Sequence, residues 1–188
     1  CSSLNSQKLV LDLMTPKQRY YELNRVFGKL ILAINNLPQV VVTVLEGAVL
    51  GGGFGLACVS DIGICHAEAK FGMPETTLGL IPAQIAPFVV QRIGLTQTRQ
   101  LTLMAERFGG KRALEIGLVH YLENSQEDLD KRVDIVCERI RQCAPGANAK
   151  TKQLLLDVGS VPMDELLNRI QESLKNTFPL NLVYIHLK

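Results

Sequence analysis

The stretch that decides the fold spans residues 46–82 and reads EGAVLGGGFGLACVSDIGICHAEAKFGMPETTLGLIP. Three consecutive glycines, Gly51, Gly52 and Gly53, follow an apolar run and precede the apolar segment FGLACVS. Because glycine lets the backbone turn sharply into the start of a helix, free N–H groups are exposed there. Such N–H groups favour a negative oxygen, which is either a bound phosphate or the oxyanion that develops on a reacting carbonyl.

Neither common phosphate-binding pattern fits the glycine run. No Lys-Ser or Lys-Thr pair follows the glycines as in a P-loop. Their spacing is also not that of a dinucleotide-binding fingerprint. The absence of both patterns favours the oxyanion interpretation. Three adjacent glycines on their own, however, indicate close packing of a strand against a helix about as often as an anion site.

Glu75 supplies an acidic side chain to the same stretch. It lies among Phe71, Met73, Leu78 and other apolar residues. A carboxylate in such surroundings would be partly desolvated and suited to exchanging protons near neutral pH. The alternative is an acidic residue at the start of a helix after Pro74, and without the glycines this alternative would be the better interpretation.

These residues resemble the crotonase superfamily, also called the enoyl-CoA hydratase/isomerase family. The resemblance rests on A-x-x-G-G-G at 48–53, the pair Ser60-Asp61, and A-K-F-G-x-P-E-x-x-L-G-x-I-P at 69–82. It implies an α/β fold, a ClpP/crotonase-like spiral of ββα units with a C-terminal helical region. We expect a crotonase core at 1–122, N-terminally incomplete because the family places further units before Cys1. The helical region at 123–188 is expected to cover the active site and form a trimer interface.

The resemblance implies a lyase that adds water to an α,β-unsaturated acyl-CoA. An enoyl-CoA isomerase and a non-catalytic acyl-CoA-binding module are the alternatives. The Gly52 N–H would be one of two donors to the thioester oxygen, with Glu75 as the general acid and base. The second donor falls at Leu4, where Ser3 replaces the usual glycine. The residues expected to contact the substrate are Gly51, Gly55, Ile81, Pro82, Ala83 and Gln84.

Two departures from the family pattern bear on the substrate. Gly55 stands where the best-known hydratases carry a second glutamate, and the loop after Glu75 reads IPAQIAPF instead of the usual I-P-G-x-G-G. Together they resemble the branch that hydrates branched glutaconyl-CoA esters, such as methylglutaconyl-CoA and isohexenylglutaconyl-CoA. We expect the distal carboxylate of such a substrate, or a water that it orders, to occupy the space of the missing glutamate. The single carboxylate also permits an isomerase.

Composition narrows the class of protein. A chain of 188 residues with 47% hydrophobic content predicts one main domain with a substantial core, and a net charge of +2 argues against a general nucleic-acid role. The five cysteines lack a C-x-x-C pair, and the three histidines lack ligand spacing. We therefore expect reduced thiols, no metal site and no cofactor, since coenzyme A belongs to the substrate.

The sequence and its resemblance to the family also lead to expectations about localisation and partners. The sequence contains no secretory leader and no long apolar run, so we expect a cytoplasmic protein without membrane contact. The resemblance adds an acyl-CoA as the small-molecule partner, a role in fatty acid and branched acyl-CoA metabolism, and a homotrimer or dimer of trimers. For the tail at 179–188 we have no functional account.

Periodicity predicts alternating helices and strands outside the central stretch. Thr15 and Pro16 predict the start of a helix that ends near 35–38, with a buried face of Leu23, Val26, Phe27, Leu30, Ile31 and Ile34. The segment 40–45 predicts a strand covered on both sides. Further strands are expected at 62–67 and 118–122. Further helices are expected at 54–59, 83–92, 96–105, 111–116, 128–143, 147–157 and 163–178.

Two smaller expectations concern individual side chains. Leu101, Leu103 and Met104 are expected to face the core. Lys150 and Lys152 are expected either to lie on a solvated helix face or, as the resemblance implies, to approach the phosphates of the coenzyme.

Overall fold

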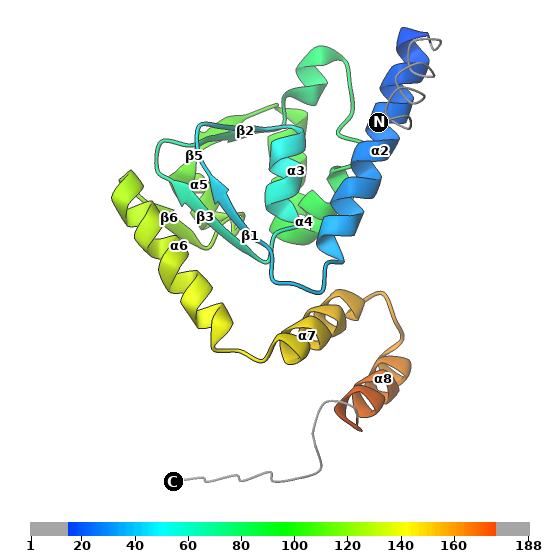
Figure 1. The fold of residues 1–188 in the computed structure, drawn as a ribbon. Helices are drawn as coiled ribbons and strands as arrows, with labels where there is room; N and C mark the ends of the chain where they lie inside the picture. The colour runs from blue at the N-terminus through cyan, green and yellow to red at the C-terminus, as the bar shows by residue number, and fades with distance from the viewer. Residues whose placement is uncertain (1–14, 176–188) are drawn as a thin grey trace, which may run out of the picture.

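The computed structural model of this chain describes residues 15–175 (Figure 1). Helices and short strands alternate along it. In chain order the elements are α2 (Pro16–Asn35), β1 (Val42–Leu45), β2 (Ala48–Leu50), α3 (Gly52–Cys58), β3 (Ile62–His66), β4 (Lys70–Gly72), the 3-10 helix η1 (Pro74–Leu78), α4 (Ala86–Leu103), β5 (Arg107–Gly109), α5 (Gly110–Glu115), β6 (Tyr121–Glu123), α6 (Gln126–Arg141), α7 (Pro145–Asp157) and α8 (Met163–Lys175).

Two three-stranded sheets form the centre of the molecule. In the first, β1, β3 and β6 are parallel, with Val42 opposite Ile62 and Ile64 opposite Tyr121. In the second, β2 is parallel to β4, and β4 is antiparallel to β5. The chain thus places one strand in each sheet and then a helix, first as β1-β2-α3 and again as β3-β4 followed by η1 and α4. This repeat confirms the predicted α/β arrangement of ββα units.

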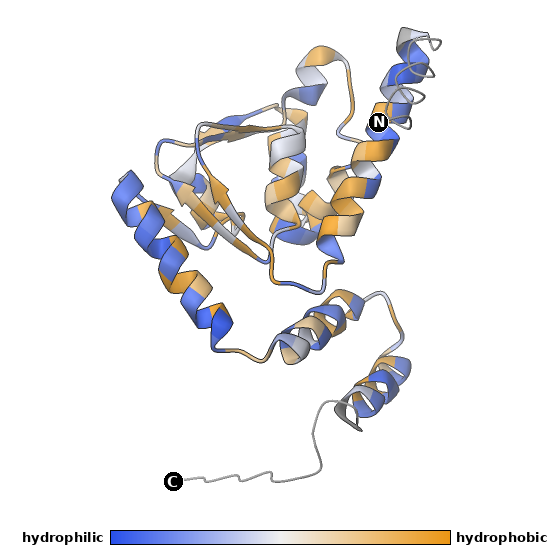
Figure 2. Cartoon of the chain, in the orientation of Figure 1, coloured by the Kyte–Doolittle hydropathy of each residue, from blue (hydrophilic) through white to orange (hydrophobic). Residues whose placement is uncertain are grey.

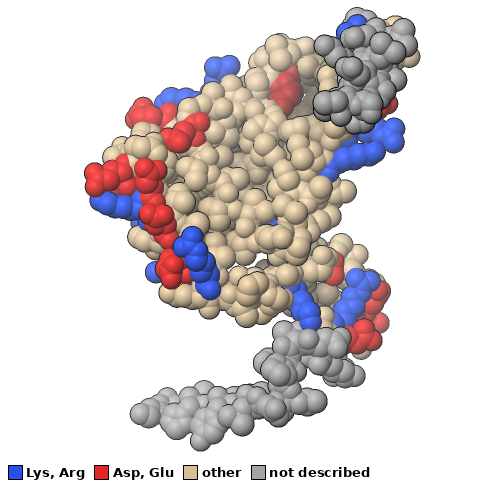
Figure 3. All heavy atoms as spheres, in the orientation of Figure 1, with Lys and Arg blue, Asp and Glu red and all other residues tan. Residues whose placement is uncertain are grey.

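Aromatic rings and aliphatic side chains fill the core between the second sheet and the helices α3 and α4. Phe71 stacks on Phe108 with ring centroids 5.7 Å apart, and Phe54 meets Phe108 edge to face at 6.1 Å. On the other sheet, Leu129 and Val136 of α6 pack on Ile64. Figure 2 shows hydrophobic residues on α3 and the strands, whereas α6 is largely hydrophilic. In Figure 3 charged side chains gather along α6.

Helix α2 begins and ends where the sequence predicts. Thr15 caps it in a capping box with Gln18, and the helix ends at Asn35. The prediction of a continuous buried face, however, was wrong. Ile31 is fully buried, but Leu23 and Val26 are 59% and 60% exposed, and Leu30 is exposed as well. The helix packs on the core only through the part near its C-terminus, with Phe27, Ile31 and Ile34.

Three other expectations about strands and burial were wrong. Val44 is exposed, so β1 is not covered on both faces. Leu103 and Met104 are exposed at the end of α4, and only Leu101 faces the core. The last strand begins at Tyr121 rather than at residue 118. The strands β2, β4 and β5 were not predicted, since three residues are too short to show a periodicity.

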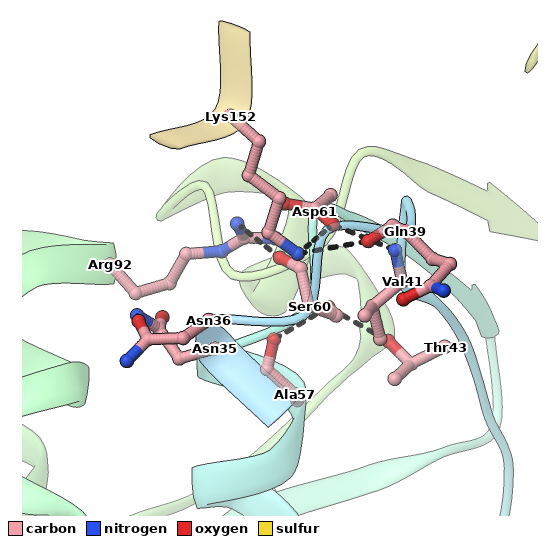
Figure 4. Close-up of polar contacts among 10 residues, drawn as sticks. All are labelled: Asn35, Asn36, Gln39, Val41, Thr43, Ala57, Ser60, Asp61, Arg92 and Lys152. Carbon is pink, nitrogen blue, oxygen red and sulfur yellow. Dashed lines mark hydrogen bonds and ion pairs between the residues drawn. The ribbon is translucent and has the colours of Figure 1, made fainter. Parts of the chain in front are cut away.

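Lys152 joins α7 to the core (Figure 4). Its Nζ lies 2.7 Å from Oδ2 of Asp61 and donates to the carbonyl of Gln39 at 3.1 Å. Asp61 also accepts from the N–H of Val41 at 2.7 Å. The Lys152 side chain is only 10% exposed. The expected solvated face is therefore wrong for this lysine, and the contact to the coenzyme phosphates stays a prediction.

Replacing Lys152 by Met is expected to lower the free energy of unfolding by about 2 kcal/mol, because the partly buried Asp61 would lose its ion-pair partner. Urea denaturation followed by circular dichroism measures this loss. Lys150→Met is the matched control on the same helix, since the Lys150 ammonium donates to the Ser173 carbonyl in an exposed hydrogen bond. An equal loss in both variants would contradict the role given to the ion pair.

Candidate active site

A cavity of about 300 Å³ lies between α2 and the segment that follows β4. In Figure 3 the surface is hollowed between α2 and η1. The cavity brings together residues from distant parts of the chain, so that Gly52 and Glu75 line the same cavity. Its lining residues are Tyr20, Leu23, Asn24, Phe27, Gly52, Glu75, Ile81, Pro82, Ala83, Gln84 and Ile85.

The glycine turn sets the shape of one wall. Gly51 precedes α3 with φ 51° and ψ −114°, a backbone conformation that favours glycine, and its N–H donates to the carbonyl of Gly72 at 3.1 Å. Gly52 is the first residue of α3, and no side chain caps this helix. Its N–H therefore has no acceptor within the helix. A Cβ at Gly52 would lie 2.8 Å from Cζ of Phe27, so the ring closes tightly over the bare backbone.

Glu75 lies in the first turn of η1 and lines the same cavity. Its Oε2 atom is buried and has no hydrogen-bond partner among the described residues. Its Oε1 atom is directed toward the glycine turn, where a Cβ on Gly51 would lie 3.2 Å away. Because burying an unpartnered carboxylate oxygen is unfavourable, such an atom calls for an interaction outside the chain itself.

The predicted site residues fall into four groups, of which the last contains only Gly55. Gly52, Glu75, Ile81, Pro82, Ala83 and Gln84 line the cavity. Gly51 does not line it but adjoins Glu75. Leu4 lies outside the described residues.

Gly55 is buried in α3 away from the cavity lining. A Cβ at this position would overlap the side chain of Ile85 and approach Cδ1 of Ile31 to 3.0 Å. The space that a Cβ at Gly55 would need is thus filled by Ile85. The expectation that a substrate carboxylate or its water takes the place of the second glutamate stays a prediction.

The wall that α2 contributes to the cavity was not predicted from the sequence. Tyr20, Leu23, Asn24 and Phe27 line the cavity together with Ile85. Their three- and four-residue spacing is visible in the sequence, but Leu23 and Phe27 were assigned to the core because an apolar stripe most often packs inward. Only the tertiary structure shows that this stripe borders a cavity.

The remaining reactive side chains lie elsewhere. Burial raises the pKa of the Cys58 thiol to about 12, and burial together with the Glu123 carboxylate raises that of Cys65 to about 11, so neither is a thiolate near neutral pH. Burial and then Arg92 lower the pKa of His120, whose Nδ1 accepts from the Gly63 N–H at 3.0 Å. Between residues 15 and 175 no cluster of acidic, His or Cys side chains is arranged to hold a metal ion. No helix in that part of the chain is long and apolar enough to cross a membrane.

Residues 7–170 match the family described as enoyl-CoA hydratase/isomerase. The chain is 32% identical over 137 residues to "Enoyl-CoA hydratase ACTT6" of Alternaria alternata, covering 73% of this chain and 45% of that protein. It is 31% identical over 144 residues to the peroxisomal Delta(3,5)-Delta(2,4)-dienoyl-CoA isomerase of Arabidopsis thaliana, covering 74% of this chain and 51% of the relative. The chain thus spans about half the length of the curated relatives it matches.

Solved structures agree with the family match. Pseudomonas aeruginosa AtuE superposes with a TM-score of 0.83 at 52% identity, covering 85% of this chain and 62% of that one. An enoyl-CoA hydratase/isomerase from Marinobacter aquaeolei superposes with a TM-score of 0.82 at 50% identity, covering 87% and 62%. With this fold and the match over residues 7–170, the chain belongs to the enoyl-CoA hydratase/isomerase family of the crotonase superfamily.

Proposed function

We propose that the protein adds water to the double bond of an α,β-unsaturated acyl-CoA. The observation that carries this proposal is the buried, unpartnered Oε2 of Glu75 in a cavity whose wall also includes Gly52. A carboxylate and a free backbone donor facing one cavity are the two groups that such a reaction needs. Curated relatives named enoyl-CoA hydratases support the same assignment.

The Gly52 N–H would act on the thioester. When it donates to the carbonyl oxygen, it withdraws electrons from the conjugated system and makes the β-carbon electrophilic. The negative charge that develops on this oxygen during addition strengthens the hydrogen bond, so the donor stabilises the transition state more than the substrate. The second donor of such a pair is predicted at Leu4.

Glu75 would transfer the protons. Its carboxylate accepts one proton from a water molecule while the water oxygen forms a bond to the β-carbon, and the π electrons move to leave an enolate. The protonated Glu75 then delivers that proton to the α-carbon, and the thioester carbonyl re-forms. One carboxylate thus suffices for the net addition of one water.

The finer proposal is that the substrate is a branched glutaconyl-CoA. The cavity combines apolar walls, such as Leu23 and Ile85, with the amides of Asn24 and Gln84. Neither side-chain amide makes a hydrogen bond to a described residue. Amide N–H groups can donate to a distal carboxylate, whereas the apolar wall suits a branched carbon chain.

A second candidate function is isomerisation of an enoyl-CoA. It is favoured by the single carboxylate in the cavity and by the relative named as a dienoyl-CoA isomerase. In that reaction Glu75 would remove a proton from one carbon and return it to another, with the same enolate stabilised at Gly52.

Incubation with methylglutaconyl-CoA, isohexenylglutaconyl-CoA and crotonyl-CoA separates these proposals, with product mass as the readout. We expect the product of a glutaconyl ester to gain the mass of one water, and crotonyl-CoA to react more slowly. A gain of water only on crotonyl-CoA would refute the glutaconyl proposal. A shifted double bond at unchanged mass would replace hydration by isomerisation.

A further inference from the structure

We propose that Thr102 is a positioning residue that holds the chain on both sides of Glu75. The inference rests on the proposed function, since it concerns how the acid and base group is aimed into the cavity. Thr102 lies near the end of α4 and does not line the cavity. It would act on the reaction only through Glu75.

The Glu75 carboxylate is not fixed by hydrogen bonds to other described residues. Its Oε2 has no hydrogen-bond partner, and within the described chain no side-chain bond is formed by its other oxygen. The direction of the carboxylate is therefore set by the backbone of η1. This element is an exposed 3-10 helix of five residues, a conformation that is weakly stabilised on its own.

Thr102 contacts the residues that flank Glu75. Its hydroxyl donates to Sδ of Met73 at 3.6 Å, and its carbonyl accepts from the hydroxyl of Thr76 at 3.0 Å. Met73 is 1% exposed, so the first contact lies against the core. The Thr102 carbonyl also accepts from the Ala105 N–H at 3.4 Å, and because a carbonyl oxygen has two lone pairs it can accept from Thr76 as well.

The other hydrogen bonds of η1 are internal to the loop. The N–H of Leu80 donates to the Glu75 carbonyl at 3.0 Å, and the N–H of Gly79 donates to the Thr76 carbonyl at 3.2 Å. The Thr77 hydroxyl donates to the Pro74 carbonyl at 2.7 Å. These bonds shape the turn but do not tie it to α4. The two contacts of Thr102 supply that tie.

Two substitutions remove the contacts one at a time. Thr76→Val deletes the donor to the Thr102 carbonyl, and Thr102→Val deletes the donor to Met73. We expect Thr76→Val to lower kcat about 10-fold and Thr102→Val a few-fold, with KM changed less than about twofold, because a displaced carboxylate slows proton transfer without altering ground-state binding. Serine at either position restores the hydroxyl and is expected to restore kcat.

Thr98→Val is the matched control. Its hydroxyl donates to the Gly94 carbonyl one turn earlier in α4 and makes no hydrogen bond to η1, so a loss of kcat through general weakening of α4 would appear there too. The rate of hydrogen exchange at the Gly79 and Leu80 amides reports on the contact between Thr76 and Thr102 independently of enzyme activity. We expect faster exchange in Thr76→Val but not in Thr98→Val.

The outcomes distinguish a failure of the positioning role from a failure of the proposed function. Unchanged kcat and unchanged exchange in Thr76→Val, beside an inactive Glu75→Gln, would overturn the positioning role alone. An equal loss of kcat in Thr98→Val would also overturn it. Full turnover by Glu75→Gln would overturn the proposed function and the positioning role together.

Discussion

Replacing Glu75 by Gln is expected to lower kcat by about 10²- to 10⁴-fold, the range typical of general acid and base catalysis. Glutamine keeps the size and shape of the side chain but neither accepts a proton from water nor delivers one to the α-carbon. Because the apolar walls and the Gly52 N–H remain, KM should change little. Steady-state turnover of methylglutaconyl-CoA measures both constants.

Glu68→Gln is the control for this experiment, because Glu68 is exposed between β3 and β4 and does not line the cavity. It should keep full activity. A Glu75→Gln protein with kcat near that of Glu68→Gln would show that this carboxylate does not transfer the protons.

Removing the Gly52 N–H is expected to lower kcat by about 10²- to 10³-fold, as found for single donors to an oxyanion. Gly52→Pro removes this donor, and proline is accepted at the first position of a helix, which Gly52 occupies in α3. The loss should fall on kcat, since the donor contributes most when charge has developed on the thioester oxygen.

Gly52→Ala serves as the matched control. Both substitutions place a Cβ against the ring of Phe27, where it would lie 2.8 Å from Cζ, but alanine keeps the N–H. Proline must therefore cost more than alanine if the donor matters. Equal losses in the two variants would assign the effect to Phe27 and would contradict a role for the N–H.

The residues of one contiguous stretch were predictable as candidates. The glycines before α3 and the Pro-Glu pair before η1 are local signals, because an uncapped helix start and a proline at the first turn can be read from neighbouring residues. The alternation of strands and helices was predictable for the same reason, since apolar runs mark β1, α3 and β3. The second strand of each ββα unit, β2 or β4, is too short to show such a pattern, so the repeat itself was implied only by the resemblance to the family. The catalytic roles of Gly52 and Glu75 stay predictions.

Contacts between distant segments could not be predicted. Lys152 pairs with Asp61 across a separation of 91 residues, and no periodicity in α7 indicates that partner. Ile85 fills the space over Gly55, and the α2 stripe that includes Phe27 borders the cavity rather than only the core. Each of these depends on how elements pack, which a pattern along one segment does not contain.

The most direct test of hydration by a single carboxylate is the mass of the product formed from methylglutaconyl-CoA in water labelled with heavy oxygen, and separately in deuterium oxide. Hydration by Glu75 alone predicts one solvent oxygen on the β-carbon and one solvent-derived hydrogen on the α-carbon, both lost in Glu75→Gln. A product without solvent oxygen would contradict it.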